Sequence, residues 1–210
     1  MAPRNKFSRD EMIEKAVQVV RKQGIGALTA KSLANELGVS TQPVFTCFHT
    51  IEEVRREVVN AAKILYDDYV KEGLCNDIPF LGFGMHYIRF AKEEPELYRL
   101  LFLSTDSTDQ SEGNSAFEEM NASLELVTDS MQETYHIDAK TAERYFRDMW
   151  LVAHSLATLI VTGSCPYTDQ EIGRILTGFS IGHCMAIKEI PGFVEDNYDK
   201  DAIFRELIKK

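Results

Sequence analysis

The spacing of the apolar residues is the strongest constraint on the fold of this chain. Across its 210 residues, Val, Ile and Leu recur three and four positions apart rather than at alternate positions. That is the period of an amphipathic helix and not of a half-buried strand. A hairpin signal, such as Asn-Gly between two alternating apolar runs, is also missing. The sequence therefore predicts an all-α protein.

Capping residues mark where the helices begin. Ser8, Thr50 and Thr168 are each followed three residues later by Glu, which is the pattern of a capping box. Glycines that favour a left-handed C-cap mark the predicted stops, at Gly24, Gly38, Gly73, Gly163 and Gly192. The resulting helices cover residues 8–23, 30–37, 41–47, 51–72, 77–93, 95–103, 115–135, 139–162, 168–189 and 199–209.

Two domains are expected, without a linker between them. The polar run at 104–114 reads as a loop inside the second domain. The break falls in or just after the fourth helix. We therefore expect an N-terminal domain over residues 1–55 and a C-terminal helical domain over residues 56–210.

The net charge of −10 by itself argues against a partner as acidic as DNA. The charge is uneven, however. Residues 1–63 carry 10 Lys and Arg against 7 Asp and Glu, a balance of +3, while residues 64–210 carry 13 against 26, a balance of −13. A basic module on an acidic body is typical of a protein that presents one face to phosphate.

Other classes of site have little support in the sequence. No apolar run reaches membrane-spanning length, and the first residues lack the apolar stretch of a signal peptide, so we expect a cytoplasmic protein without a membrane partner. The four cysteines, Cys47, Cys75, Cys165 and Cys184, are widely separated. This spacing predicts no metal site and no cofactor; it favours buried thiols, with a redox switch at Cys47 or Cys184 as the alternative.

The segment from Leu28 to Val54 has the pattern of a helix-turn-helix. Its two short helices can cross closely because Ala34 is small and Gly38 can adopt the left-handed conformation of a tight turn. Ser40 is placed to cap the second helix, and Pro43 falls in that helix's first turn, where a missing amide costs little. A helical hairpin without a DNA-binding role is the plainer interpretation of the same pattern.

The second helix of this motif presents side chains suited to the major groove. Gln42 can pair with adenine, hydroxyls can reach bases or phosphates, and apolar groups can contact a thymine methyl. Thr29 and Lys31 begin the preceding helix, whose amides and dipole favour phosphate. Arg4, Lys6 and Arg9 form a basic arm or first turn. The predicted DNA-binding residues are Thr29, Lys31, Ser40, Thr41, Gln42, Pro43, Phe45, Thr46 and His49.

Residues 8–59 resemble the DNA-binding domain of the TetR family of transcriptional regulators. The resemblance rests on the turn at residues 38–40, on the aromatic pair Phe45 and Phe48, and on the helix start at residues 52–54. Two departures accompany it. The family usually has Tyr in place of Phe45 and Lys in place of Ile51, and both usual residues contact phosphate. The resemblance therefore implies a DNA-binding regulator whose operator binding is weakened by two lost contacts.

A second resemblance lies in the C-terminal half. Residues 90–102 are similar to a helix junction in one subgroup of the family, and Trp150, His154 and Gly163 resemble that subgroup's Trp-His-Gly signature, with Ser155 where a Gly is usual. Trp150 and His154 share a helix face. With neighbouring aromatic and Met residues they predict an interior that is either an apolar pocket with polar anchors or plain core. The candidate ligand-binding residues are His86, Phe90, Tyr98, Phe102, Phe117, Met120, Trp150 and His154, with Met149 and Tyr87 in the same interior.

A homodimer is expected through the helices near 139–162 and 168–189. The second of these carries apolar residues together with Gly173, Gly178 and Gly182, which permit close helix approach. The family resemblance implies a four-helix bundle across a two-fold axis, which would place two recognition helices on a palindromic operator in double-stranded DNA.

The resemblance implies a repressor released from its operator by a small-molecule effector, with helix four transmitting the change between domains. An enzyme or carrier with a helical pocket and a vestigial helix-turn-helix is the alternative, but the chain has no phosphate loop, H-E-x-x-H motif or nucleophile elbow. A third possibility is a regulator whose C-terminal domain only dimerises, which predicts a filled interior beside Trp150.

Overall fold

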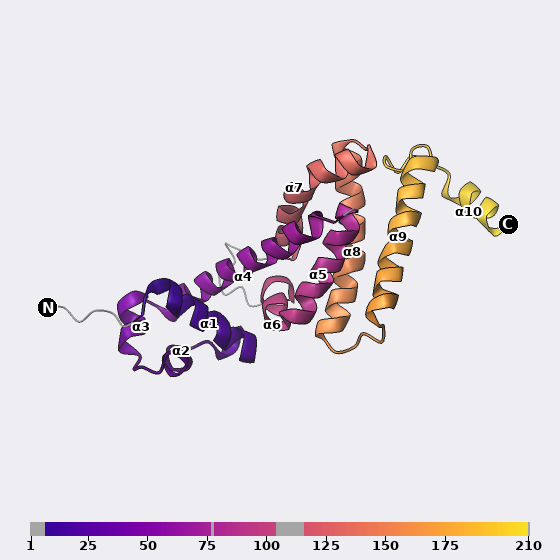
Figure 1. The fold of residues 1–210 in the computed structure, drawn as a ribbon. Coiled ribbons are helices and arrows are strands. Elements are labelled where there is room, and N and C mark those ends of the chain that lie inside the picture. The colour runs from indigo at the N-terminus through magenta and orange to yellow at the C-terminus, as the bar shows by residue number, and fades with distance from the viewer. Residues whose placement is uncertain (1–6, 77, 104–115, 210) are drawn as a thin grey trace.

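The computed structural model describes residues 7–76, 78–103 and 116–209, and within these ranges every regular element is helical (Figure 1), which confirms the all-α prediction. The elements are α1 (Arg9–Gln23), the 3₁₀ turn η1 (Ile25–Ala27), α2 (Ala30–Leu37), α3 (Gln42–Cys47), α4 (Ile51–Leu74), α5 (Pro79–Glu93), α6 (Pro95–Tyr98), the π-helical turn η2 (Arg99–Leu103), α7 (Ala116–Tyr135), α8 (Ala139–Val161), α9 (Asp169–Glu189) and α10 (Lys200–Ile208).

The three short N-terminal helices gather at one end of the molecule, opposite α9 and α10 (Figure 1). Helix α1 begins at a complete capping box, because Ser8 Oγ accepts from the Glu11 amide and the Glu11 carboxylate accepts from the Ser8 amide. Helix α1 buries Met12, Ala16 and Val20 against α2 and α4. These contacts form the core of the N-terminal helices, against which α2 and the turn that follows it are packed.

Helix α4 is a single helix of 24 residues that is shared between the two halves of the protein. Near its start, Glu53 and Glu57 pair with Arg9 of α1. In its middle, the Tyr66 hydroxyl lies 2.9 Å from Ser123 Oγ of α7. Its last turns pack on α5. The helix therefore passes from one core to the other without a joint.

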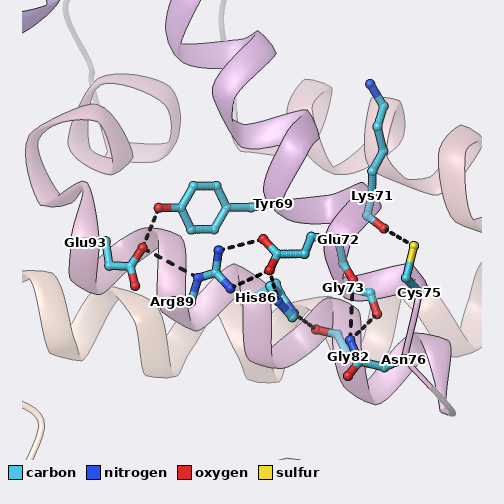
Figure 2. Close-up of polar contacts among 10 residues, drawn as sticks. All are labelled: Tyr69, Lys71, Glu72, Gly73, Cys75, Asn76, Gly82, His86, Arg89 and Glu93. Carbon is cyan, nitrogen blue, oxygen red and sulfur yellow. Dashed lines mark hydrogen bonds and ion pairs between the residues drawn. The ribbon is translucent and has the colours of Figure 1, made fainter.

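The end of α4 is held to α5 by close backbone contact and by a polar network (Figure 2). Arg89 of α5 donates to both carboxylate oxygens of Glu72, at 3.1 and 2.7 Å, and its guanidinium lies over the Tyr69 ring. The Tyr69 hydroxyl donates to Glu93 at 2.6 Å. Charge-assisted, two-pronged contacts of this kind fix orientation more firmly than single hydrogen bonds. Together they hold the C-terminal end of α4 against α5.

Helices α5, α7 and α8 form the C-terminal core, and α9 lies alongside α8 (Figure 1). The face of α9 that turns inward buries only Ile172 and Leu176. Helix α10 projects away from the body and has no buried residue. The segment between α9 and α10 is held by Arg144 of α8, which donates to the Val194 carbonyl oxygen at 2.7 Å and to Asp196 at 2.9 Å.

Most predicted helices have bounds within one or two residues of the observed ones, but three local expectations are corrected. Gly73 lies inside α4, where it permits close packing against Gly82, and does not end the helix. The predicted helix 95–103 is divided between α6 and the π-helical turn η2. Thr50 caps the Glu53 amide, but the Glu53 carboxylate bonds to the His49 amide, so the box is incomplete. The predicted loop at 104–114 lies outside the described residues.

The described ranges, residues 7–76, 78–103 and 116–209, also bear on membrane and metal sites. In these ranges, no helix is long and apolar enough to cross a membrane, and no group of three or more His, Cys, Asp or Glu side chains is arranged to hold a metal ion. All four cysteines are free thiols. None of the four is fully buried as expected: Cys47, Cys165 and Cys184 are partly buried, and Cys75, at the C-cap of α4, is exposed.

Candidate functional site

The turn between α2 and α3 has the geometry that the sequence predicts. Gly38 adopts a left-handed conformation with φ of 67° and ψ of 36°. The Val39 amide then donates to the Ala34 carbonyl oxygen at 3.0 Å, closing the end of α2. Ala34 is buried at the crossing, and Val44 and Phe48 bury the inner face of α3. The outer face of α3 is thereby left to solvent.

All the predicted DNA-contact residues lie at the start of α2 or on and around α3. Pro43 is half-buried in the first turn of α3, and the other eight are exposed. Phe45 is 52% exposed, so its ring is available for contact with a thymine methyl. The Thr46 hydroxyl donates to the Gln42 carbonyl oxygen at 2.9 Å within the helix, so its oxygen remains available as an acceptor.

Two details at this surface differ from the expectation. The N-cap of α3 is Thr41 rather than Ser40, and the cap makes no side-chain hydrogen bond, so both hydroxyls are exposed and uncommitted to capping. Thr29 caps α2 and forms a reciprocal box with Ser32, at 3.1 and 2.9 Å. Sequence reasoning missed this box because Ser replaces the usual Glu at its third position.

Arg9 does not extend outward as part of a basic arm. Its guanidinium donates to Glu53 at 2.9 Å and Glu57 at 2.6 Å, and it lies 4.3 Å above the Phe48 ring. The His49 amide and Arg9 together lower the pKa of Glu53. Arg9 therefore ties α1 to the corner between α3 and α4. Arg4 and Lys6 lie outside the described residues.

The predicted ligand-binding residues of the C-terminal domain form, for the most part, one aromatic cluster. Trp150 stacks on His154 with ring centroids 4.6 Å apart and planes 10° apart. Tyr98 stacks face-on against the His154 ring, and Phe102 packs edge-on against it. Phe90 and Met120 are buried in the same core. The structure thus brings six of the eight residues together, from five different helical elements.

A hydrogen-bonded network runs through this cluster. The hydroxyls of Tyr87 and Tyr98 lie 2.9 and 3.0 Å from His154 Nδ1, and Tyr98 also contacts Thr158 Oγ1 at 3.2 Å. Burial raises the pKa of both tyrosines and lowers that of His154, so all three are held neutral. Thr158, one turn after His154, was not singled out from the sequence, although its spacing places it on the same face.

Two predicted ligand residues are placed elsewhere. His86 lies at the α4–α5 contact, where its Nδ1 is 2.9 Å from the Gly82 carbonyl oxygen and its Nε2 is 3.7 Å from Glu72 (Figure 2). Phe117 is 58% exposed at the first turn of α7, with its ring 6.3 Å from that of Trp150. Placing His86 and Phe117 in the interior was therefore wrong: one faces the polar side of α5, and the other stands at the rim of the cluster.

Trp150 lines neither of two cavities formed by the described residues of the C-terminal domain. A small apolar cavity of about 10 Å³, room for roughly one water molecule, is lined by Phe80, Leu81, Phe83, Gly84, Met149, Ala153, Leu176 and Ser180. A shallow groove of about 530 Å³ runs along the outer face of α9 beside Gly178 and Gly182. The aromatic cluster itself is closely packed, with Trp150 only 1% exposed.

Comparison with known proteins decides the family. Residues 80–209 match a family described as "Tetracyclin repressor-like, C-terminal domain", which covers more than half of the chain. The protein belongs to the TetR family. The matched range contains the helix junction at 90–102 and the Trp150–Gly163 segment. Membership makes this TetR-family protein a transcriptional regulator, and such regulators in general bind a DNA operator and an effector and are typically non-enzymatic.

Solved structures support the fold of this TetR-family regulator. A protein of unknown function from Rhodococcus sp. RHA1 is 18% identical, with a TM-score of 0.68 over 89% of this chain and 98% of its own. A TetR family member from Streptomyces coelicolor A3 is also 18% identical, with a TM-score of 0.59 over 84% and 98%. At this identity the likeness concerns the fold. The search of curated proteins finds no match.

Proposed function

We propose that this regulator binds a palindromic operator as a homodimer through α2 and α3, and that a small-molecule effector bound in its C-terminal domain weakens that binding. The observation that carries the proposal is the helix-turn-helix itself. It is closed by the left-handed Gly38, it exposes polar side chains on the outer face of α3, and α4 joins it to the TetR-family domain without a break.

Recognition is assigned to a small set of side chains. Gln42 has the amide group that can pair with the N6 and N7 edge of adenine, and Phe45 is exposed beside it. Thr29 and Lys31, at the start of α2, are suited to phosphate, which the free amides of the helix N-terminus also attract. Specificity is thus expected from α3, and most of the salt dependence from the start of α2.

The dimer is assigned to the outer faces of α8 and α9. Helix α8 exposes Leu151 and Leu159, and α9 exposes Phe179, Ile181 and Met185, at 38–59% each. A Cβ atom added at Gly178 or Gly182, one helical turn apart, would meet nothing within 4 Å, so a second helix has room to approach. Exposed apolar faces of this extent mark association surfaces.

Communication between the two sites is assigned to α4 and the α6 segment. Helix α4 is fixed to α1 at one end and to α5 at the other, as described above. Arg21 of α1 donates to both oxygens of Glu94, at 2.7 and 2.6 Å, just before α6. Residues Tyr98 and Phe102, which surround His154, follow within two turns. A ligand that displaces them would shift the relative position of the DNA-binding helices.

One observation favours a second candidate function for the C-terminal domain. Trp150 is closely packed and lines neither of the cavities described, which is the arrangement expected if the domain only dimerises. Both candidates keep the operator-binding role. They differ in whether any small molecule changes the environment of Trp150 and the affinity for DNA.

Operator binding is tested by selecting genomic fragments with the purified protein at low and moderate salt and sequencing the bound DNA. Enrichment of a palindrome, lost as salt rises, supports the proposal. Gln42→Ala should relax specificity at one base pair, while Lys31→Ala should weaken all sequences alike and flatten the salt slope by about one unit. Absence of enrichment at either salt would favour a helical ligand-binding protein or an enzyme with a vestigial helix-turn-helix.

A further inference from the structure

The indole nitrogen of Trp150 is a buried hydrogen-bond donor without a partner. Trp150 is 1% exposed, and in the part of the chain that the structure describes its Nε1 makes no hydrogen bond. A buried N–H that is left unpaired costs roughly 1–3 kcal/mol, so such groups are uncommon and call for an explanation. A hydrogen-bond acceptor supplied by a bound molecule would satisfy this donor.

A second donor lies on the ring stacked against Trp150. Two tyrosine hydroxyls converge on His154 Nδ1, at 2.9 and 3.0 Å. A phenol donates well to an imidazole nitrogen, so we assign Nδ1 as the acceptor, which places the proton of the neutral ring on Nε2. The stacked pair therefore carries two N–H donors, Trp150 Nε1 and His154 Nε2.

The surroundings of this pair select against charge. Its ring neighbours are Tyr87, Tyr98, Phe102 and Phe117, and all of these are neutral. Burying an ammonium ion against two N–H donors is unfavourable, and burying a carboxylate without a cation is costly. A neutral hydrogen-bond acceptor on an otherwise apolar molecule avoids both of these costs.

We propose that the effector is an apolar molecule with a neutral carbonyl group, and that its oxygen accepts hydrogen bonds from Trp150 Nε1 and His154 Nε2. The proposal rests on the effector site proposed above and names its ligand class. Phe117, at the rim and more than half exposed, is the side chain whose displacement would uncover Trp150. Because the cluster is packed, the measured affinity is lowered by the small population of the open form.

The chain offers its own probe of this site, because Trp150 is its only tryptophan. We would titrate the full-length protein with four molecules of similar shape, namely 4-phenyl-2-butanone, butylbenzene, 4-phenylbutylamine and 3-phenylpropionate, and follow tryptophan emission. The ketone should bind most tightly. Butylbenzene, which lacks the acceptor, should bind about 5- to 30-fold more weakly, the range expected for one or two neutral hydrogen bonds. Equal binding of the ketone and butylbenzene, tighter binding of the amine or the acid, or no response to any of the four would overturn the proposal.

Variants measured by calorimetry complete the test. Trp150→Phe keeps an aromatic ring but removes the donor, and it should abolish the preference for the ketone over butylbenzene. Tyr145→Phe removes a buried hydroxyl that contacts Ser180 at 2.6 Å, outside the cluster, and it should leave the preference intact. Operator binding is measured on the same samples. Ketone binding without release of DNA would leave the site standing and refute effector control, whereas operator binding without ketone binding would refute the site alone.

Discussion

Replacing Gly73 of α4 with Ala should destabilise the protein by forcing two helix backbones apart. A Cβ atom at this position would lie 2.8 Å from the Gly82 carbonyl oxygen and 2.9 Å from the Phe83 Cα. Both neighbours are backbone atoms, so the clash cannot be relieved by a side-chain rotation. Overpacking of this kind costs about 1–3 kcal/mol or more, while Ala gains about 1 kcal/mol over Gly as a helix former. Because backbone atoms cannot turn aside, we take the upper end of that range, about 3 kcal/mol, so the expected net loss is about 2 kcal/mol, or roughly 4–8 °C in Tm for a chain of this size.

The assay is thermal and urea unfolding followed by circular dichroism at one fixed protein concentration, since association would shift the apparent stability. Gly26→Ala is the matched control, because a Cβ there would meet nothing within 4 Å and the backbone needs no left-handed φ. It should remain within about 0.5 kcal/mol of the parent. A Gly73→Ala protein as stable as the parent would refute the argument that close backbone contact fixes the end of α4.

Three further predictions concern the DNA surface, the junction and pH. Phe45→Tyr adds a hydroxyl to an exposed ring and should steepen the salt dependence of DNA binding by about one unit, as read from titrations at several salt concentrations; an unchanged slope would count against a phosphate contact at this position. Arg21→Ala leaves the Glu94 carboxylate, 13% exposed, without its two-pronged partner and should cost about 1–3 kcal/mol in urea unfolding, while an unaltered midpoint would contradict this. Burial lowers the pKa of His154 and His183 below 6.5 in the folded state, so the unfolded chain binds more protons and stability, complete above pH 6.5, falls as the pH drops. His154→Phe should reduce that fall in Tm between pH 7.5 and 5.5, and an equal fall in both proteins would be the opposing result.

The helices could be predicted from the sequence because their signals are local. The bounds of α1, Arg9–Gln23, follow from the capping Ser8 before it and Gly24 after it. Gly73 was misread for a related reason. A glycine that permits helix contact looks the same in sequence as one that ends a helix, and only the position of Gly82 distinguishes them. The π-helical turn was likewise not predicted, because no local sequence pattern distinguishes it from a continuing α-helix.

The two candidate sites also differ in how far they could be predicted from local sequence signals. The DNA-binding surface is contiguous in sequence, so its residues could be named together. The aromatic cluster draws on α5, α6, η2, α7 and α8, and periodicity alone could not decide which face of each helix turns inward. His86 is one position from Tyr87, yet it lies on the polar side of α5 while Tyr87 is buried beside His154. Phe117 is apolar but stands at the rim, because α7 begins there.

The unbroken course of α4 sets a rule for building chimaeras from this protein. Helix α4 is unbroken between Glu57, which pairs with Arg9, and Tyr66, which lies beside Ser123. A fusion of the N-terminal DNA-binding domain to another sensor domain therefore has to be made within a continuous helix. Each inserted residue would turn the sensor by about 100° and move it about 1.5 Å along the axis. Seven inserted residues nearly restore the original rotation of the sensor domain about the helix axis, whereas two turn it to nearly the opposite side. A series of insertions at residues 59–61 should therefore give regulation that rises and falls with helical phase.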